Sequence, residues 1–258
     1  MSIRLQFLGT CACDYSPKLE NEFKNKFDYD ARRSSALLVD DTVLIDCGEH
    51  TLESLDILGI PYNQITDILI THTHDDHFNE KHIEKIAKNR HSPLRLWIRE
   101  DANISCIPNV EVVKMKLFER YELENRFYVT SMIANHDPKA FPQHFLLEKS
   151  DKRIFYGCDG AWLLTDTYNY LQGKNLDAMI LDATVGDYEG DYRISEHNSI
   201  PMIRLMLPSL KTNRTTNEKT RIILSHIAPS LHKSHRETVE IANVFGALVA
   251  YDGLIMEV

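Results

Sequence analysis

One short stretch of the chain combines residue types that bind metal ions. Residues 71–77 read Thr-His-Thr-His-Asp-Asp-His and follow an apolar run that predicts a buried strand. Side chains alternate along a strand, so His72 and His74 are expected to point to the same side. Asp76 and His77 come where the chain turns away, and they can approach from another side. Imidazoles and carboxylates at this spacing favour zinc, with manganese and iron as alternatives. A loop that is rich in histidine by chance is the competing interpretation.

Other apolar runs of the chain also end in a potential metal ligand. The residues at these predicted strand ends are Asp46, His72, His74, His136, Asp159 and His226. Any one of them alone is more often a turn cap or a hydrogen-bonded histidine. Ligands at the ends of several strands can converge on one edge of a sheet, where the strands position them rigidly. The set therefore predicts one metal site that is built from distant segments.

The composition indicates an ordinary globular protein. The chain has 258 residues, of which 43% are hydrophobic and 26% are charged, and its formal net charge is −9. We predict a single domain over residues 1–258, because the sequence shows no low-complexity segment and no compelling domain boundary. The negative charge disfavours nucleic acid as a partner, although a local basic patch stays an alternative.

The number of cysteines and the length of the apolar runs indicate the cellular location of the protein. The five cysteines are scattered and odd in number, which argues against a disulfide framework and predicts a reducing, cytoplasmic location. Cys11 and Cys13 are too close together for the usual pair of zinc-binding cysteines. The N-terminus shows no secretory pattern and no apolar run nears membrane-spanning length, so no membrane association is expected. A homo-oligomer stays an open alternative.

Strand and helix patterns alternate along the chain, which predicts an α/β fold. Helices are predicted over residues 50–58, 81–89, 161–171 and 232–245, and residues 195–199 are predicted to open a further helix with Pro201 in its first turn. The charged segment from Thr10 to Arg33 is interpreted as a lid, an oligomer contact or a solvated insertion. Within it, we favour surface salt bridges for Arg32 and Arg33 over contact with an anionic substrate.

The order of these motifs resembles the metallo-β-lactamase-fold hydrolase superfamily. The resemblance covers nearly the whole chain, from Ile3 to Val258, and implies a four-layer αββα sandwich with two metal ions at the sheet edges. It rests on the His72-x-His74-x-Asp76-His77 run, with Asp46 before it and His136, Asp159 and His226 after it. It implies that one metal binds His72, His74 and His136. It implies that the other binds Asp76, His77 and His226. By the same resemblance, Asp159 bridges the two metals and Asp46 orders the loop from behind the ligands.

Two further motifs resemble the PhnP-like and ribonuclease Z-like phosphodiesterases. Glu196-His197-Asn198-Ser199 is similar to a histidine motif of these enzymes, and Ala250-Tyr251-Asp252-Gly253-Leu254 is similar to the PhnP-type ending. The aspartate at the bridging position also looks unlike the lactamases themselves. The chain departs from the PhnP pattern near its N-terminus. The PhnP family carries a cluster of zinc-binding cysteines there, and this chain has only Cys11 and Cys13.

The resemblance implies a hydrolase with two divalent metal ions, zinc being favoured over manganese and iron. We predict a phosphodiesterase that acts on a small-molecule phosphodiester with a metal-bridging hydroxide as the nucleophile. Asp76 would orient the water or accept its proton, and His197 would assist the leaving group. His235, at the start of the last predicted helix, is a possible contact to the substrate phosphate. The alternatives are a hydrolase of a carboxylic ester, lactone or thioester, and a non-catalytic metal-binding protein.

Overall fold

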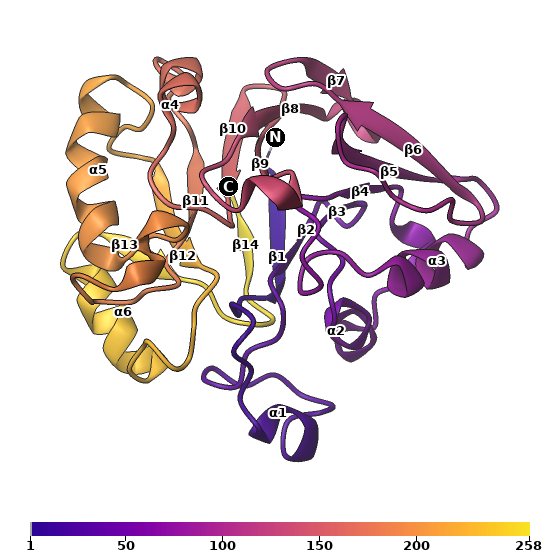
Figure 1. The fold of residues 1–258 in the computed structure, drawn as a ribbon, viewed down its shortest axis with the longest axis horizontal. Helices are drawn as coiled ribbons and strands as arrows, with labels where there is room; N and C mark the ends of the chain where they lie inside the picture. Colours follow the sequence, from indigo (N-terminus) through magenta and orange to yellow (C-terminus); the bar gives the residue numbers. More distant parts are fainter. Residues whose placement is uncertain (1) are drawn as a thin grey trace.

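The computed structural model describes residues 2–258, which form two seven-stranded sheets (Figure 1). The first sheet has the strand order β14-β1-β2-β3-β4-β5-β6. Its strands are β1 Arg4–Gly9, β2 Ala36–Val39, β3 Val43–Ile45, β4 Asp67–Leu69, β5 Leu94–Arg99, β6 Val110–Met115 and β14 Ile255–Glu257. The second sheet has the order β13-β12-β11-β10-β9-β8-β7. Its strands are β7 Arg120–Glu122, β8 Tyr128–Ile133, β9 Gln143–Lys149, β10 Lys152–Gly157, β11 Ala178–Asp182, β12 Arg221–Ser225 and β13 Ala247–Val249.

Each sheet has an antiparallel part and a parallel part. In the first sheet, β14, β1, β2 and β3 pair antiparallel, whereas β3, β4, β5 and β6 pair parallel. In the second sheet, β7 to β10 pair antiparallel, whereas β10, β11, β12 and β13 pair parallel. Parallel neighbours bring their carboxyl ends to the same edge of a sheet, so the residues that follow these strands are placed close together.

Helices cover the outer faces of both sheets, so the predicted four-layer αββα sandwich is confirmed. The helices are α1 Lys18–Asn21, α2 Thr51–Leu58, α3 Glu80–Lys88, α4 Thr165–Leu171, α5 Ile200–Thr212 and α6 His235–Asn243. Leu55 of α2 and Ile83 of α3 pack on the first sheet, and Ile203 of α5 and Ala242 of α6 pack on the second. A third cluster, which includes Phe145, fills the space between the sheets. No helix among residues 2–258 is both long enough and apolar enough to cross a membrane.

Two predicted helices are shorter than the sequence pattern indicated. The helix predicted over residues 161–171 begins only at Thr165, and the one predicted over 232–245 spans His235–Asn243. Ser234 explains the second boundary, because its hydroxyl accepts a hydrogen bond from the amide of Glu237 and caps the helix there. The helix that residues 195–199 were predicted to open is α5, which starts at the end of that stretch, with Ser199 as its N-cap and Pro201 in its first turn.

The charged segment before β2 is fastened to the C-terminal part of the chain, and the prediction of surface salt bridges for its two arginines is wrong. Arg32 and Arg33 are 2% and 0% exposed. The guanidinium of Arg33 donates to the backbone of Phe23 and to Glu53, which folds the segment back on itself. The amide of Arg33 donates to the buried carboxylate of Asp252, 219 residues away in sequence.

Candidate metal centre

The histidine-rich loop leaves β4 and lies against the turn that follows β3. The amide of Cys47 donates to the carbonyl of His77 at 2.8 Å, and Cys47 pairs with Phe78 in an isolated bridge. Gly48 allows this approach, because a Cβ atom there would lie only 1.7 Å from the carbonyl oxygen of Asp76. The loop is therefore placed by backbone contacts that only glycine permits at position 48.

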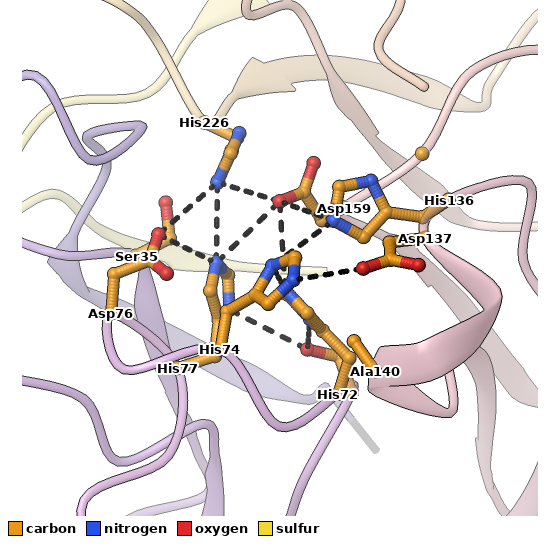
Figure 2. Close-up of polar contacts among 12 residues, drawn as sticks. Ser35, His72, His74, Asp76, His77, His136, Asp137, Ala140, Asp159 and His226 are labelled. Carbon is orange, nitrogen blue, oxygen red and sulfur yellow. Dashed lines mark hydrogen bonds and ion pairs between the residues drawn. The ribbon is translucent and has the colours of Figure 1, made fainter. Parts of the chain in front are cut away.

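The first donor group consists of three histidines from two segments. His72 Nε2 lies 2.9 Å from His74 Nδ1, and His136 Nε2 lies 3.2 Å from the same atom. His72 and His74 come from the loop after β4, and His136 follows β8. All three rings converge in Figure 2. These nitrogens lie close enough together to serve as ligands of one metal ion.

The second donor group consists of Asp76, His77 and His226 and lies on the other side of Asp159 (Figure 2). His77 Nε2 lies 3.2 Å from His226 Nε2 and 3.2 Å from Asp76 Oδ2. Asp159 Oδ2 reaches both groups, at 3.2 Å from His226 Nε2 and 3.8 Å from His72 Nε2. One carboxylate thus faces two sets of imidazole nitrogens. This is the arrangement that a bridging ligand between two metal ions requires.

Asp46 supports the loop from behind. Its carboxylate is fully buried and accepts hydrogen bonds from the amide and hydroxyl of Thr71. Its Oδ2 also lies 2.8 Å from His77 Nδ1. A carboxylate accepts, so His77 Nδ1 carries a ring proton and leaves Nε2 as the nitrogen that faces the centre. The structure therefore places Asp46 where the sequence predicted a supporting aspartate.

Asp182 and Thr184 support the opposite side, and the sequence analysis did not select them as site residues. The hydroxyl of Thr184 lies 2.7 Å from Asp182 Oδ1, to which it donates, and 2.7 Å from His226 Nδ1, from which it accepts. Asp182 also accepts from the amide of Gly160, next to Asp159. The sequence feature that could have identified Asp182 is its position at the end of an apolar strand, which Asp46 shares. Thr184 carried no signal of its own.

His197 lies beside the bridging carboxylate. Its Nδ1 is 2.7 Å from Asp159 Oδ1 and 2.8 Å from Asp182 Oδ2. Burial disfavours the charged ring, but the two carboxylates outweigh burial and raise the pKa of His197 to about 11. The backbone around it is tied to the first donor group, since the carbonyl of Glu196 lies 3.4 Å from His136 Nδ1.

The chemistry of the donor set fits metal cations. Burial lowers the pKa of His226 to about 3 and of His136 to about 4, so both rings are neutral at pH 7, the form that binds metals. The Nε2 atoms of His77 and His226 face each other at 3.2 Å while both Nδ1 atoms are hydrogen-bonded to oxygen. Burial opposes the charge of His77, but Asp76 and Asp46 raise its pKa well above the ordinary value, so a proton on His77 Nε2 occupies this contact when no metal is bound, and a metal cation can take the place of that proton. The contact therefore fits a bound cation.

The remaining histidines and cysteines lie outside these donor groups. His235 stacks on Tyr29 and lies 2.9 Å from a nitrogen of Arg32, and no contact joins it to the donor groups within residues 2–258. His144 is buried beneath the centre, with Nε2 3.2 Å from the carbonyl oxygen of Asp159. Cys11 is buried and Cys13 is exposed. Neither belongs to a candidate metal group of the described residues.

Comparison with known proteins places this centre in a known fold. The model of the family described as "Anti-Pycsar protein Apyc1" matches residues 23–105, which include the histidine-rich loop. A search of curated proteins returned no match. The structure is similar to the metallo-β-lactamase fold protein YhfI from Bacillus subtilis, with 13% identity over 100% of both chains and a TM-score of 0.77.

Two other solved structures resemble the chain over nearly its whole length. One is a diphosphatase from the PhnP family, with 18% identity, coverage of 100% of this chain and 98% of the other, and a TM-score of 0.73. The other is the short form of human tRNase Z, with 19% identity, coverage of 98% of each chain and a TM-score of 0.67. This protein has the metallo-β-lactamase fold. The resemblance predicted from the motifs is confirmed at the level of the fold.

Proposed function

We propose that this protein is a hydrolase that works with two divalent metal ions and cleaves small phosphodiesters. One ion would bind the first donor group, which consists of His72, His74 and His136. The other would bind the second donor group, which consists of Asp76, His77 and His226. The single observation that carries the proposal is Asp159 Oδ2, which lies 3.2 to 3.8 Å from nitrogens of both groups. Mixed nitrogen and oxygen donors favour zinc and also accept manganese or iron.

The chain's own residues supply the rest of the chemistry. When bound, divalent ions of this kind activate a water molecule for nucleophilic attack and stabilise the negative charge that develops on the attacked group. Asp76 is placed to orient this water or accept its proton, because its carboxylate faces the centre beside His77 and His226. Although burial opposes its charge, the charge of His77 and a hydrogen bond from it lower the pKa of Asp76, so Asp76 is an acceptor at neutral pH.

His197 is the candidate that assists the leaving group. Its Nδ1 is fixed between Asp159 and Asp182, at 2.7 and 2.8 Å, which sets the orientation of the ring at the edge of the centre. Its side chain keeps 16% of its surface exposed, whereas His226 keeps 2%. A ring that is oriented from one side and accessible from the other can donate a proton to a departing alkoxide. We assign this role to His197, with Asp182 orienting it.

Charge and the names of similar proteins support a small phosphoester substrate. The PhnP-family protein is a diphosphatase by name, and tRNase Z acts on tRNA by name. The net charge of −9 disfavours a polyanionic substrate. The lining of a groove of about 550 Å³ beside the histidine-rich loop has three acidic residues, Glu49, Asp75 and Glu80, against one basic residue, Lys81. This excess of negative charge disfavours a long phosphate backbone. We therefore propose a short or cyclic diester rather than RNA.

The test compares reaction classes in zinc- and manganese-loaded protein. Bis(p-nitrophenyl) phosphate and a panel of cyclic mononucleotides represent phosphodiesters, and a lactone and a thioester represent carbonyl substrates. We expect hydrolysis of at least one phosphodiester that stops on chelation and returns when metal is restored. Activity confined to the lactone or thioester would establish the alternative hydrolase. Binding of two metals without hydrolysis across the panel would contradict the enzymatic assignment.

A further inference from the structure

A second cavity, separate in its lining from the metal centre, lies at the beginning of α6. Its volume is about 180 Å³, and none of its lining residues belongs to either donor group. The wall includes Arg32 from the charged N-terminal segment and His232, Lys233 and His235 from the turn into α6. Asp30 is the acidic residue of the lining. Segments about 200 residues apart in sequence thus build one small basic pocket.

Arg32 is the feature that needs explanation. Its side chain is almost fully buried, yet no carboxylate oxygen of residues 2–258 lies within 4.0 Å of its guanidinium. The guanidinium donates to the hydroxyl of Thr10, the carbonyl of Ala250 and Nδ1 of His235, all of which are neutral acceptors. Its Nε–H makes no hydrogen bond within the described chain. The charges of Asp252, Asp30 and Asp28 favour the charged guanidinium only from a distance, so an anion in direct contact with it would be stabilising.

The carboxylates nearby favour the charge of Arg32, but none of them contacts its guanidinium directly among residues 2–258. Asp252 reaches Arg32 only through the hydroxyl of Thr10, which donates to Asp252 Oδ1 at 2.8 Å. Asp30 Oδ1 accepts from the amide of His235 at 2.6 Å and so caps α6. Lys233 makes no ion pair with a described residue and adds a second positive charge. His235 accepts from Arg32 through Nδ1, so its Nε2 carries the ring proton and can donate to a ligand.

We propose that this pocket is a second binding site, for a small phosphate dianion such as inorganic phosphate. Guanidinium and ammonium groups are the side-chain groups that bind phosphate oxygens in proteins, and Arg32 and Lys233 supply both in the wall of this pocket. The volume of about 180 Å³ is below the roughly 300–1,000 Å³ of sites that enclose drug-sized ligands. The pocket therefore fits a phosphate group rather than a whole nucleotide. This inference does not depend on the proposed hydrolase function.

The test measures phosphate binding in metal-loaded protein by isothermal titration calorimetry with inorganic phosphate. Lys233→Ala removes one charge from the pocket wall at an exposed position, so the fold is retained. Arg236→Ala is the matched control, because Arg236 carries the same charge three residues further on, is 89% exposed and does not line the pocket. We expect Lys233→Ala to weaken phosphate binding by about tenfold or more, the loss of one charged partner, and Arg236→Ala to change it less than about twofold.

The metal centre could itself bind phosphate, and the two variants separate the possibilities. Phosphate binding that is equally strong in Lys233→Ala and wild type would belong to the metal centre and would overturn the proposal. The proposal would also be overturned if wild-type protein bound no phosphate at millimolar concentration. Equal weakening of phosphate binding in Lys233→Ala and Arg236→Ala would overturn it too, because it would indicate a general charge effect rather than a site. A second variant, His235→Ala, should also weaken binding, because it removes the imidazole N–H.

Discussion

The two halves of the chain supply the candidate metal centre in different ways. The N-terminal half supplies four donors, His72, His74, Asp76 and His77, from one loop, and Asp46 supports them. The C-terminal half contributes single residues that follow separate strands. The loops after β10, β11 and β12 carry Asp159, Thr184 and His226, and these strands are parallel and in register, with Gly157 opposite Leu181 and Asp182 opposite Ser225. Local spacing therefore positions the donors from the N-terminal half, and sheet register positions those from the C-terminal half.

Substitution of Asp159 should have the largest effect, because its carboxylate faces both donor groups. Asp159→Asn keeps the shape of the side chain but removes the charge that faces both donor groups at 3.2 to 3.8 Å. We expect the metal content to fall by about one ion or more per chain and diester turnover to fall by about 10³-fold or more. Metal analysis by mass spectrometry and a turnover assay measure the two effects.

Asp137→Asn is the matched control for this variant. Its carboxylate lies 3.8 Å from His74 Nε2 on the outer side of the cluster and is partly exposed. It should leave metal content unchanged. If Asp159→Asn retained both metals at wild-type affinity, the bridging assignment would be wrong, and the two halves would have to bind their ions independently.

Removal of His197 tests the chemistry rather than the metal binding. His197→Ala should keep both metals and lower turnover of an alkyl phosphodiester by about 10²-fold, the usual contribution of a general acid. A p-nitrophenyl leaving group needs little protonation, so the same variant should lose much less activity on that substrate. Asp182→Asn should show the same dependence on the leaving group more weakly, since Asp182 orients the ring. Equal losses on both substrates would indicate a structural role for His197.

The same difference between the halves explains what could be predicted from the sequence. The loop of residues 71–77 was recognisable because its donors are contiguous. Asp159, His136 and His226 were recognisable as strand ends, and their order along the chain carried the resemblance to a known superfamily. Thr184 could not be selected, because its role arises from the register of β11 against β12.

The N-terminal segment also shows that contacts between distant residues cannot be predicted from local sequence patterns. The burial of Arg32 and Arg33 arises from contacts with Thr10, Ala250 and Asp252, and no local pattern reports a contact over more than 200 residues. Composition made both arginines look like surface residues. Only the tertiary structure shows that one of them lines a cavity.

The supporting residues of the two sides allow a direct comparison. Asp46 supports His77 with a charged hydrogen bond, and Thr184 supports His226 with a neutral one, at 2.8 and 2.7 Å. We expect Asp46→Asn to weaken metal binding by about 10- to 100-fold and Thr184→Val by about tenfold, because charged hydrogen bonds contribute more. Competition with a zinc chelator measures both. Thr184→Ser keeps the hydroxyl and should restore the affinity; failure to do so would mean that the methyl group, not the hydrogen bond, supports His226.

The smallest expected effect concerns acid stability on the C-terminal side. Burial and, to a smaller extent, the charge of Arg32 lower the pKa of His232 to about 4 against the raising effects of the Ala183 carbonyl and Asp182. The unfolded chain takes up this proton below about pH 6.5, whereas the folded protein does not, so stability is lost as the pH falls from about 6.5 to 4. The shift corresponds to at most about 3 kcal/mol.

His232→Gln should flatten this part of the pH profile, because an amide can donate to the Ala183 carbonyl as His232 Nε2 does at 2.6 Å and has no proton to gain. Urea unfolding of metal-loaded protein between pH 4.5 and 7.5 measures the difference from wild type, which cancels the titration of the metal ligands. His91→Gln, at an exposed position, is the control and should run parallel to wild type. A difference between His232→Gln and wild type that does not change with pH would show that His232 contributes packing alone. The acid sensitivity of the C-terminal side would then arise at the metal ligands themselves.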